Sequence, residues 1–103
     1  NERKTVQEVR FAPGASSANL RGSVSTGWYD EYVFAATKGQ KLLVDGVRSN
    51  AKLSLTLYGP ANSSADVRAG APFTLPASGA YHLHVDNDSV ETNVPYSLNV
   101  AIH

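Results

Sequence analysis

The stretch that decides the fold is Leu75–Val85, which reads Leu-Pro-Ala-Ser-Gly-Ala-Tyr-His-Leu-His-Val. Within it, Pro76 and Gly79 mark a tight turn. Beyond the turn, apolar residues alternate with histidines. An alternation with period two predicts a β-strand with one buried face, because successive side chains of a strand point to opposite sides. We therefore expect a rigid strand that presents a Ser-Gly turn at its start.

The same alternation recurs along the whole chain. It predicts seven or eight short strands, separated by segments rich in turn residues, and no stretch has a helical period. The predicted strands are Val6–Phe11, Leu20–Val24, Tyr29–Ala36, Lys41–Val47, Lys52–Tyr58, Phe73–Leu75, Tyr81–Val85 and Tyr96–Ile102. This pattern is typical of an all-β fold, an antiparallel β-sandwich or jelly-roll.

Three other segments carry local expectations. Residues Asn1–Lys4 are polar and are interpreted as a loose terminus. Gly22 interrupts the second strand and predicts a β-bulge there. The segment Asn62–Gly70 is small and polar without a period, so we expect a surface loop. With 103 residues the chain is expected to form one domain around a single core.

The composition argues against several classes of partner. Nine Lys and Arg balance nine Asp and Glu, and no basic stripe or basic amphipathic helix is visible, so we expect neither nucleic acid nor a membrane as partner. The chain has no Cys, which excludes disulfides and thiol catalysis. We expect no cofactor, and a monomer or homodimer. A chain without thiols is indifferent to the redox compartment, which permits export.

Polar residues in two places raise the question of a metal site. His82 and His84 lie two apart on a strand and project from the same face, as paired metal ligands do. The favoured interpretation is a solvated face opposite the buried residues. The run Asp86–Asp88 with Glu91 is interpreted as a solvated turn rather than a calcium loop, because the ligand spacing of such loops is missing. We therefore predict no metal.

The sequence argues against an enzyme. Ser78 is not part of a Gly-x-Ser-x-Gly elbow, and both nearby histidines are predicted on the outer face. Asp30 and Glu31 are adjacent in a strand, so they point to opposite faces and cannot form a facing acid and base. Trp28 and Tyr29 follow the turn at Gly27 and are candidates for partner binding, since Trp at a surface often anchors an interface. The alternative is that Trp28 covers one end of the sandwich.

Several short motifs, in this order, run along nearly the whole chain. They are Val9-Arg10-Phe11-Ala12-Pro13-Gly14, Gly27-Trp28-Tyr29-Asp30-Glu31-Tyr32-Val33-Phe34, Lys38-Gly39-Gln40, Leu57-Tyr58-Gly59-Pro60 and Leu75-Pro76-Ala77-Ser78-Gly79-Ala80-Tyr81. In these motifs and their spacing, the chain resembles the bacterial periplasmic inhibitors of invertebrate-type and goose-type lysozymes. The resemblance implies a β-sandwich that is exported to the periplasm, or secreted, and that binds a lysozyme or lysozyme-like muramidase.

The resemblance also implies where the partner binds. The turn Ser78–Tyr81 would enter the substrate cleft, where Ser78 would hydrogen-bond a catalytic carboxyl. Gly79 would allow close approach of the backbone, with Ala80 beside it, and Tyr81 would support or flank the turn. Because Tyr81 is in phase with Leu83 and Val85, we expect its ring to lie at least partly in the core. Two alternatives share the β-sandwich pattern: an accessory domain like those at the C-termini of secreted bacterial peptidases, or a carbohydrate-contacting module. A third is an immunity protein against a bacterial muramidase toxin.

Overall fold

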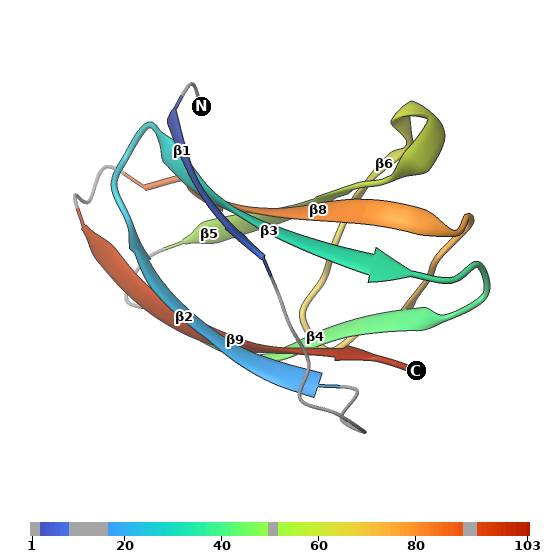
Figure 1. Ribbon diagram of the computed structural model, residues 1–103. Coiled ribbons are helices and arrows are strands. Elements are labelled where there is room, and N and C mark those ends of the chain that lie inside the picture. Colours follow the sequence, from blue (N-terminus) through green and yellow to red (C-terminus); the bar gives the residue numbers. More distant parts are fainter. Residues whose placement is uncertain (1–2, 9–16, 50–51, 90–92) are drawn as a thin grey trace.

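Two β-sheets stacked face to face make up the protein (Figure 1). The computed structural model describes the backbone of residues 3–8 and the full residues 17–49, 52–89 and 93–103. The strands are β1 (Arg3–Glu8), β2 (Ser17–Val24), β3 (Trp28–Ala36), β4 (Lys41–Ser49), β5 (Leu53–Tyr58), β6 (Ser64–Asp66), β7 (Phe73–Thr74), β8 (Gly79–Asn87) and β9 (Val94–Ile102). A 3₁₀ turn, η1 (Pro60–Asn62), connects β5 to β6. None of the described residues belongs to a helix long and apolar enough to cross a membrane.

The strand order places β8 in the middle of one sheet. The five-stranded sheet has the order β1-β3-β8-β5-β6, and the four-stranded sheet has the order β2-β9-β4-β7. Every pairing among the described strands is antiparallel except that of β1 with β3. The predicted antiparallel β-sandwich is confirmed, with this one parallel pair in addition.

The core between the sheets follows the alternation in the sequence. In β8, Tyr81, Leu83 and Val85 are 1% exposed or less, whereas His82 and His84 on the other face are partly exposed. The matching alternation in β9 buries Leu98 and Val100 completely. Burial of such side chains contributes about 1.5–3 kcal/mol each relative to exposure. This core holds β8 and its preceding turn in one place.

The strands agree with the prediction from Leu20 onward, apart from one segment. The expected loop Asn62–Gly70 contains β6, which pairs with β5 at the edge of the sheet, and Val67 beyond it is buried. The prediction of a plain loop was therefore wrong: with few apolar residues, this short edge strand depends on its partner rather than on its own pattern. The expected edge strand at Phe73 is confirmed as β7.

The predicted start of the chain differs from the structure. Strand β1 begins at Arg3, inside the segment expected to be a loose terminus. The predicted first strand, Val6–Phe11, overlaps β1 up to Glu8, and its last three residues lie outside the described residues, as do Asn1 and Glu2. The prediction of a single domain stays a prediction.

The predicted bulge at Gly22 is also wrong. The pairing of β2 with β9 runs through Gly22 without a shift in register. A Cβ atom at this position would lie 2.7 Å from the Tyr96 hydroxyl, so glycine is needed here for close approach. The shift in register lies instead in β4, between Asp45 and Arg48.

Candidate functional site

Three turns meet at one end of the sandwich, at the right in Figure 1. They are Thr37–Gln40 between β3 and β4, Gly59–Ser63 around η1, and Leu75–Ala80 leading into β8. The register explains why they meet, since Ala36 pairs with Gly79 and Tyr58 pairs with His82. We call these three segments together the loop tip. Three of the motifs that carry the resemblance lie in or next to it.

Hydrogen bonds join the β3–β4 turn to the segment before β8. The Gly39 N–H donates to the Leu75 carbonyl over 2.9 Å, and the Leu75 N–H donates to the Gln40 carbonyl over 2.8 Å. The Lys38 N–H donates to Ser78 Oγ over 2.8 Å. These bonds connect residues about forty positions apart, so the two turns form one unit rather than two independent loops.

The Tyr81 side chain supports the loop tip from the core of the sandwich. Its ring is 1% exposed and stacks on Phe34, with 5.8 Å between the ring centroids. Its hydroxyl donates to the Ala77 carbonyl over 2.5 Å and accepts from the Ala77 N–H over 3.2 Å. The expectation that Tyr81 is a core residue is confirmed. A role of Tyr81 in partner binding would therefore be exerted through the position of Ala77 and Ser78.

Gly79 is held in a conformation that few other residues adopt. Its φ is +143°, and a Cβ atom built on it would lie 2.9 Å from Cγ of Pro60. The neighbouring turn is strained as well, because Ala61 and Asn62 both have φ of +59°. Turns that are fixed in this way present a defined surface.

The predicted contact residues of the turn are accessible. Ser78, Gly79 and Ala80 are exposed, so the serine hydroxyl can be reached from outside. Ser78 Oγ accepts the hydrogen bond from the Lys38 N–H. Its own hydrogen can therefore be donated to an incoming acceptor.

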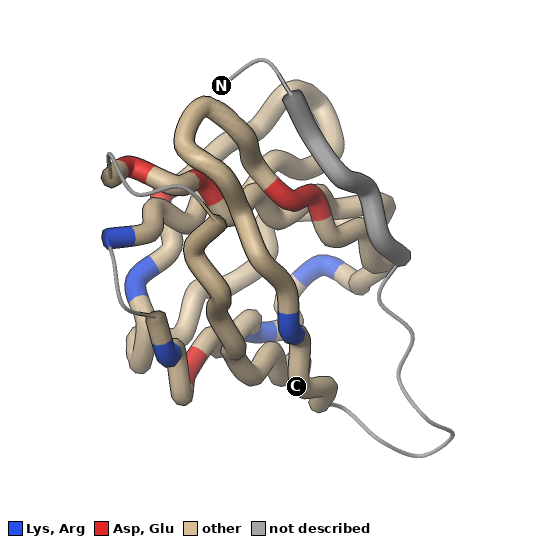
Figure 2. Tube along the Cα trace, turned by 90° about the vertical axis from the view of Figure 1, so that its left-hand side faces the viewer, with Lys and Arg blue, Asp and Glu red and all other residues tan. Residues whose placement is uncertain are grey.

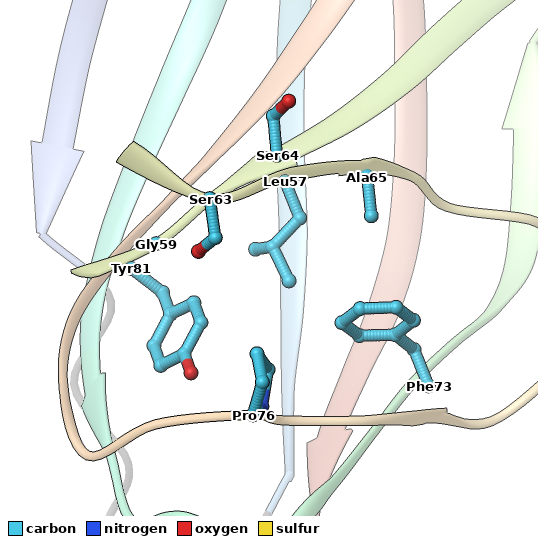
Figure 3. A pocket seen from close by; sticks show the side chains of 8 residues that line it. All are labelled: Leu57, Gly59, Ser63, Ser64, Ala65, Phe73, Pro76 and Tyr81. Carbon is cyan, nitrogen blue, oxygen red and sulfur yellow. The ribbon is translucent and has the colours of Figure 1, made fainter. Parts of the chain in front are cut away.

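An apolar pocket of about 80 Å³ lies beside the loop tip, at the edge of the sandwich (Figure 3). Its lining comes from β5, β6 and β7, from three residues of the loop tip, and from the Tyr81 ring. The residues are Leu57, Gly59, Ser63, Ser64, Ala65, Phe73, Pro76 and Tyr81. The pocket has the size of one small apolar side chain, and Pro76, two residues before Ser78, forms part of its lining.

The structure separates Trp28 and Tyr29 from the loop tip. Both lie at the start of β3, and the strand reaches the tip only at Ala36, about 26 Å away at 3.3 Å per residue. Trp28 is partly buried and packs against the core, which favours the interpretation that it covers one end of the sandwich. Their predicted role in partner binding stays a prediction, at a different place from Ser78.

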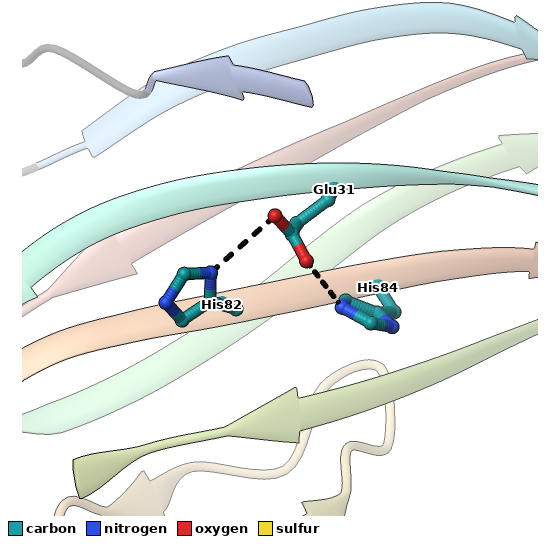
Figure 4. Close-up of polar contacts among 3 residues, drawn as sticks. All are labelled: Glu31, His82 and His84. Carbon is teal, nitrogen blue, oxygen red and sulfur yellow. Dashed lines mark hydrogen bonds and ion pairs between the residues drawn. The ribbon is translucent and has the colours of Figure 1, made fainter. Parts of the chain in front are cut away.

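The outer face of the five-stranded sheet carries a cluster that sequence reasoning missed. His84 Nε2 donates to Glu31 Oε1 over 2.7 Å, and His82 Nδ1 lies 3.4 Å from Glu31 Oε2 (Figure 4). The His84 ring lies between Tyr29 and Tyr58, with centroid distances of 4.3 and 4.6 Å. The signal for this cluster is the register between β3 and β8, in which Glu31 pairs directly with His84. That pairing cannot be derived from either strand alone.

This cluster bears on the question of catalysis and metals. Both histidines lie on the outer face, as predicted, although His84 is hydrogen-bonded to the buried carboxylate of Glu31. The pair nevertheless lies on a sheet face, and neither the pocket beside the loop tip nor the shallow hollow near Arg21 and Arg48 is lined by it. Among the described residues, no group of three or more His, Cys, Asp or Glu is arranged to hold a metal ion.

The prediction of a solvated turn at Asp86–Asp88 needs a correction. Strand β8 continues to Asn87, which is 3% exposed. Its side-chain amide donates to the Val24 carbonyl over 3.0 Å and its oxygen accepts from Ser89. Asn87 therefore closes the end of the sandwich opposite the loop tip. Glu91 lies outside the described residues.

Asp30 points in the opposite direction from Glu31, as predicted, and enters the core. The Tyr96 hydroxyl donates to its carboxylate over 2.5 Å and lies 2.6 Å from the Tyr32 hydroxyl. Burial raises the pKa of Asp30 above its ordinary value, and this effect is larger than the opposing effect of the Tyr96 hydrogen bond. Burial also raises the pKa of both tyrosines. This buried network ties the two sheets together.

Comparisons with known proteins agree with the geometry. No protein-family model matches the sequence. The chain is 39% identical over 85 residues to an inhibitor of g-type lysozyme from Escherichia coli K12, a match that covers 75% of this chain and 62% of the relative. It is 30% identical to the crystal structure of a periplasmic inhibitor of g-type lysozyme from Salmonella Typhimurium, with a TM-score of 0.80 over the full length of both chains.

The chain belongs to the family of periplasmic inhibitors of g-type lysozyme. The members named here are inhibitors and not enzymes, which fits a His–carboxylate pair that serves to connect β3 and β8. The accessory-domain alternative has support at the level of fold alone. The pre-peptidase C-terminal domain of a Bacillus anthracis collagenase is 14% identical, with a TM-score of 0.62 and coverage of 100% of this chain and 99% of that domain.

The sequence of this family member identified one part of the loop tip and missed another. It identified the Ser78 turn from the resemblance and the turn chemistry. It assigned no role to Thr37–Gln40 or to η1, although motifs in both had been noted. Those motifs were the available signal, and the structure shows that they surround Ser78.

Proposed function

We propose that this protein is a non-enzymatic inhibitor of a g-type lysozyme, acting in the periplasm, and that its loop tip enters the substrate cleft of that enzyme. Family membership supports the class of target, because relatives are described as periplasmic inhibitors of g-type lysozyme. The observation that carries the cleft-binding part is the exposed, anchored Ser78 at the end of a rigid sandwich.

The chemistry of such a cleft suits a serine. Glycoside hydrolases hold a pair of carboxyl groups at the scissile bond. Ser78 Oγ accepts from Lys38, so its hydrogen is left to donate to one of those carboxyls. A neutral hydroxyl satisfies a carboxyl without burying a second charge, whose desolvation would be costly.

The backbone around Ser78 also favours tight binding. Gly79 has no side chain, so the chain can approach the enzyme closely there. The Tyr81 hydroxyl and the β3–β4 turn already hold the segment in place. Because little conformational freedom is lost on docking, even a small interface can bind firmly.

The test is a lysis assay with a panel of g-type, invertebrate-type and chicken-type lysozymes and a bacterial muramidase. We expect inhibition of a g-type enzyme. Ser78→Ala should then weaken binding by about 1–3 kcal/mol, because an enzyme carboxyl loses its partner. Ser23→Ala, which changes an exposed serine on β2 away from the loop tip, is the matched control and should bind like the wild type.

The outcomes separate the alternatives. Failure to inhibit any lysozyme would contradict the proposed function. Inhibition of the bacterial muramidase alone would favour an immunity protein, and binding to cell-wall polymer without inhibition would favour a carbohydrate-contacting module. A Ser78→Ala protein with full inhibitory strength would show that the contact lies elsewhere.

A further inference from the structure

Lys38 is the charged part of the loop tip. Among Thr37–Gln40, Gly59–Ser63 and Leu75–Ala80 it is the sole residue with a formal charge. The residue is exposed, and its ammonium group forms no ion pair with another described residue. Figure 2 shows Lys, Arg, Asp and Glu distributed over several strands of the described chain, with uncharged stretches between them.

The position of Lys38 relative to Ser78 is fixed by the backbone. Its N–H donates to Ser78 Oγ over 2.8 Å, and the next residue, Gly39, is bonded to Leu75. Gly39 has a φ of +91°, which a side chain rarely permits, and its hydrogen bond to Leu75 holds the turn in this shape. Whatever surface Ser78 approaches, the flexible stem of Lys38 is brought there with it.

We propose that Lys38 is a second contact residue of the inhibitor, whose ammonium group pairs with a carboxylate at the acidic cleft of the target lysozyme. This inference rests on the proposed function. The two catalytic carboxyls of a glycoside hydrolase lie about 5–10 Å apart. One hydroxyl can satisfy only one of them. A cation beside Ser78 meets the remaining negative charge and attracts the cleft from a distance, which speeds encounter.

The experiment measures association and dissociation of the purified protein with the g-type lysozyme that it inhibits, at about 0.1 M and about 1 M NaCl. The Debye length falls from about 10 Å to about 3 Å between these conditions. We expect Lys38→Gln to slow association by roughly threefold to tenfold at the lower salt, with a difference below about twofold at the higher salt. Lys38→Glu should be slower still.

Lys52→Gln is the matched control, since it removes the same charge from an exposed position at the far end of β5. Leu53 beside it pairs with Asn87, about 26 Å along β8 from Gly79. Equal association rates of Lys38→Gln and Lys52→Gln would show that the inference about Lys38 is wrong. The proposed function would still stand if the wild type binds the lysozyme and Ser78→Ala binds it more weakly. If the wild type binds no lysozyme, the proposed function itself fails.

Discussion

Replacing Gly79 by Ala tests whether the loop tip is rigid for the reason given by its geometry. The φ of +143° at Gly79 lies in a region that residues with a Cβ atom rarely adopt. The new methyl carbon would also lie 2.9 Å from Pro60 Cγ, whereas apolar carbons prefer a separation of about 3.5–4.0 Å. The substitution therefore combines backbone strain with a steric clash.

The size of the effect follows from these two contributions. A residue held in a sparsely populated backbone region costs about 1–3 kcal/mol. Overpacking typically adds about 1–3 kcal/mol, and here it should be near the lower end because Pro60 is partly exposed and its turn can shift. We expect Gly79→Ala to lower the free energy of unfolding by about 2–4 kcal/mol. A protein of ordinary stability, about 5–15 kcal/mol, stays folded after such a loss.

Urea unfolding measures the loss, and two further variants divide it. Gly39→Ala is the matched control: its φ is +91°, but a Cβ atom there meets nothing within 4 Å, so it carries strain without a clash. Pro60→Ala removes the Cγ atom that the new methyl group would meet. We expect Gly79→Ala to cost more than Gly39→Ala, and to cost less in the Pro60→Ala background.

Two results would refute this reasoning. One is a Gly79→Ala protein as stable as the wild type, which would mean that the turn adopts another conformation. The other is a cost of Gly79→Ala that does not change in the Pro60→Ala background, which would mean that the two turns do not contact each other.

Two further predictions concern the supports of the loop tip and of the core. Tyr81→Phe keeps the buried ring but leaves the Ala77 N–H and carbonyl without their hydrogen-bond partner. Urea unfolding should therefore show a free energy of unfolding lower by about 1–3 kcal/mol, and the lysis assay should show about tenfold weaker inhibition. Unchanged stability would contradict the supporting role of the Tyr81 hydroxyl. Burial raises the pKa of Asp30 above its ordinary value of 3.8, so the folded state binds this proton more tightly than the unfolded state. The free energy of unfolding of the wild type, relative to that of Asp30→Asn, should therefore fall as pH rises from 3.8 through the raised pKa and stay level above it. Urea titrations of both proteins between pH 3 and 7 check this, and a difference that increases with pH would contradict it.

Much of the fold could be predicted because strand alternation is local. The Tyr81–Val85 pattern identified the buried face of β8, and the opposite directions of Asp30 and Glu31 followed from their adjacency. The prediction failed where a segment depends on its neighbour. Strand β6 has no pattern of its own and exists through its pairing with β5. A glycine such as Gly22 can mark either a bulge or a close approach, and only its surroundings distinguish the two.

The candidate site divides in the same way. The Ser78 turn was visible in the sequence because Pro, Ser and Gly are turn residues followed by a clear strand. Its partners were not visible, since Lys38 is forty positions away along the chain. The sequence also grouped Trp28 and Tyr29 with Ser78 as contact residues, and the strand direction places them at opposite ends.

The sequence by itself determined the all-β class, the inward and outward faces of the strands and the presence of an exposed Ser-Gly turn. These follow from the two-residue period of a strand and from the backbone preferences of Pro and Gly, which act within a few residues. Only the tertiary structure decided that Lys38, Pro60 and Ser78 share one tip and that Glu31 meets His84. Those contacts depend on strand order and register, which the packing of two whole sheets against each other selects.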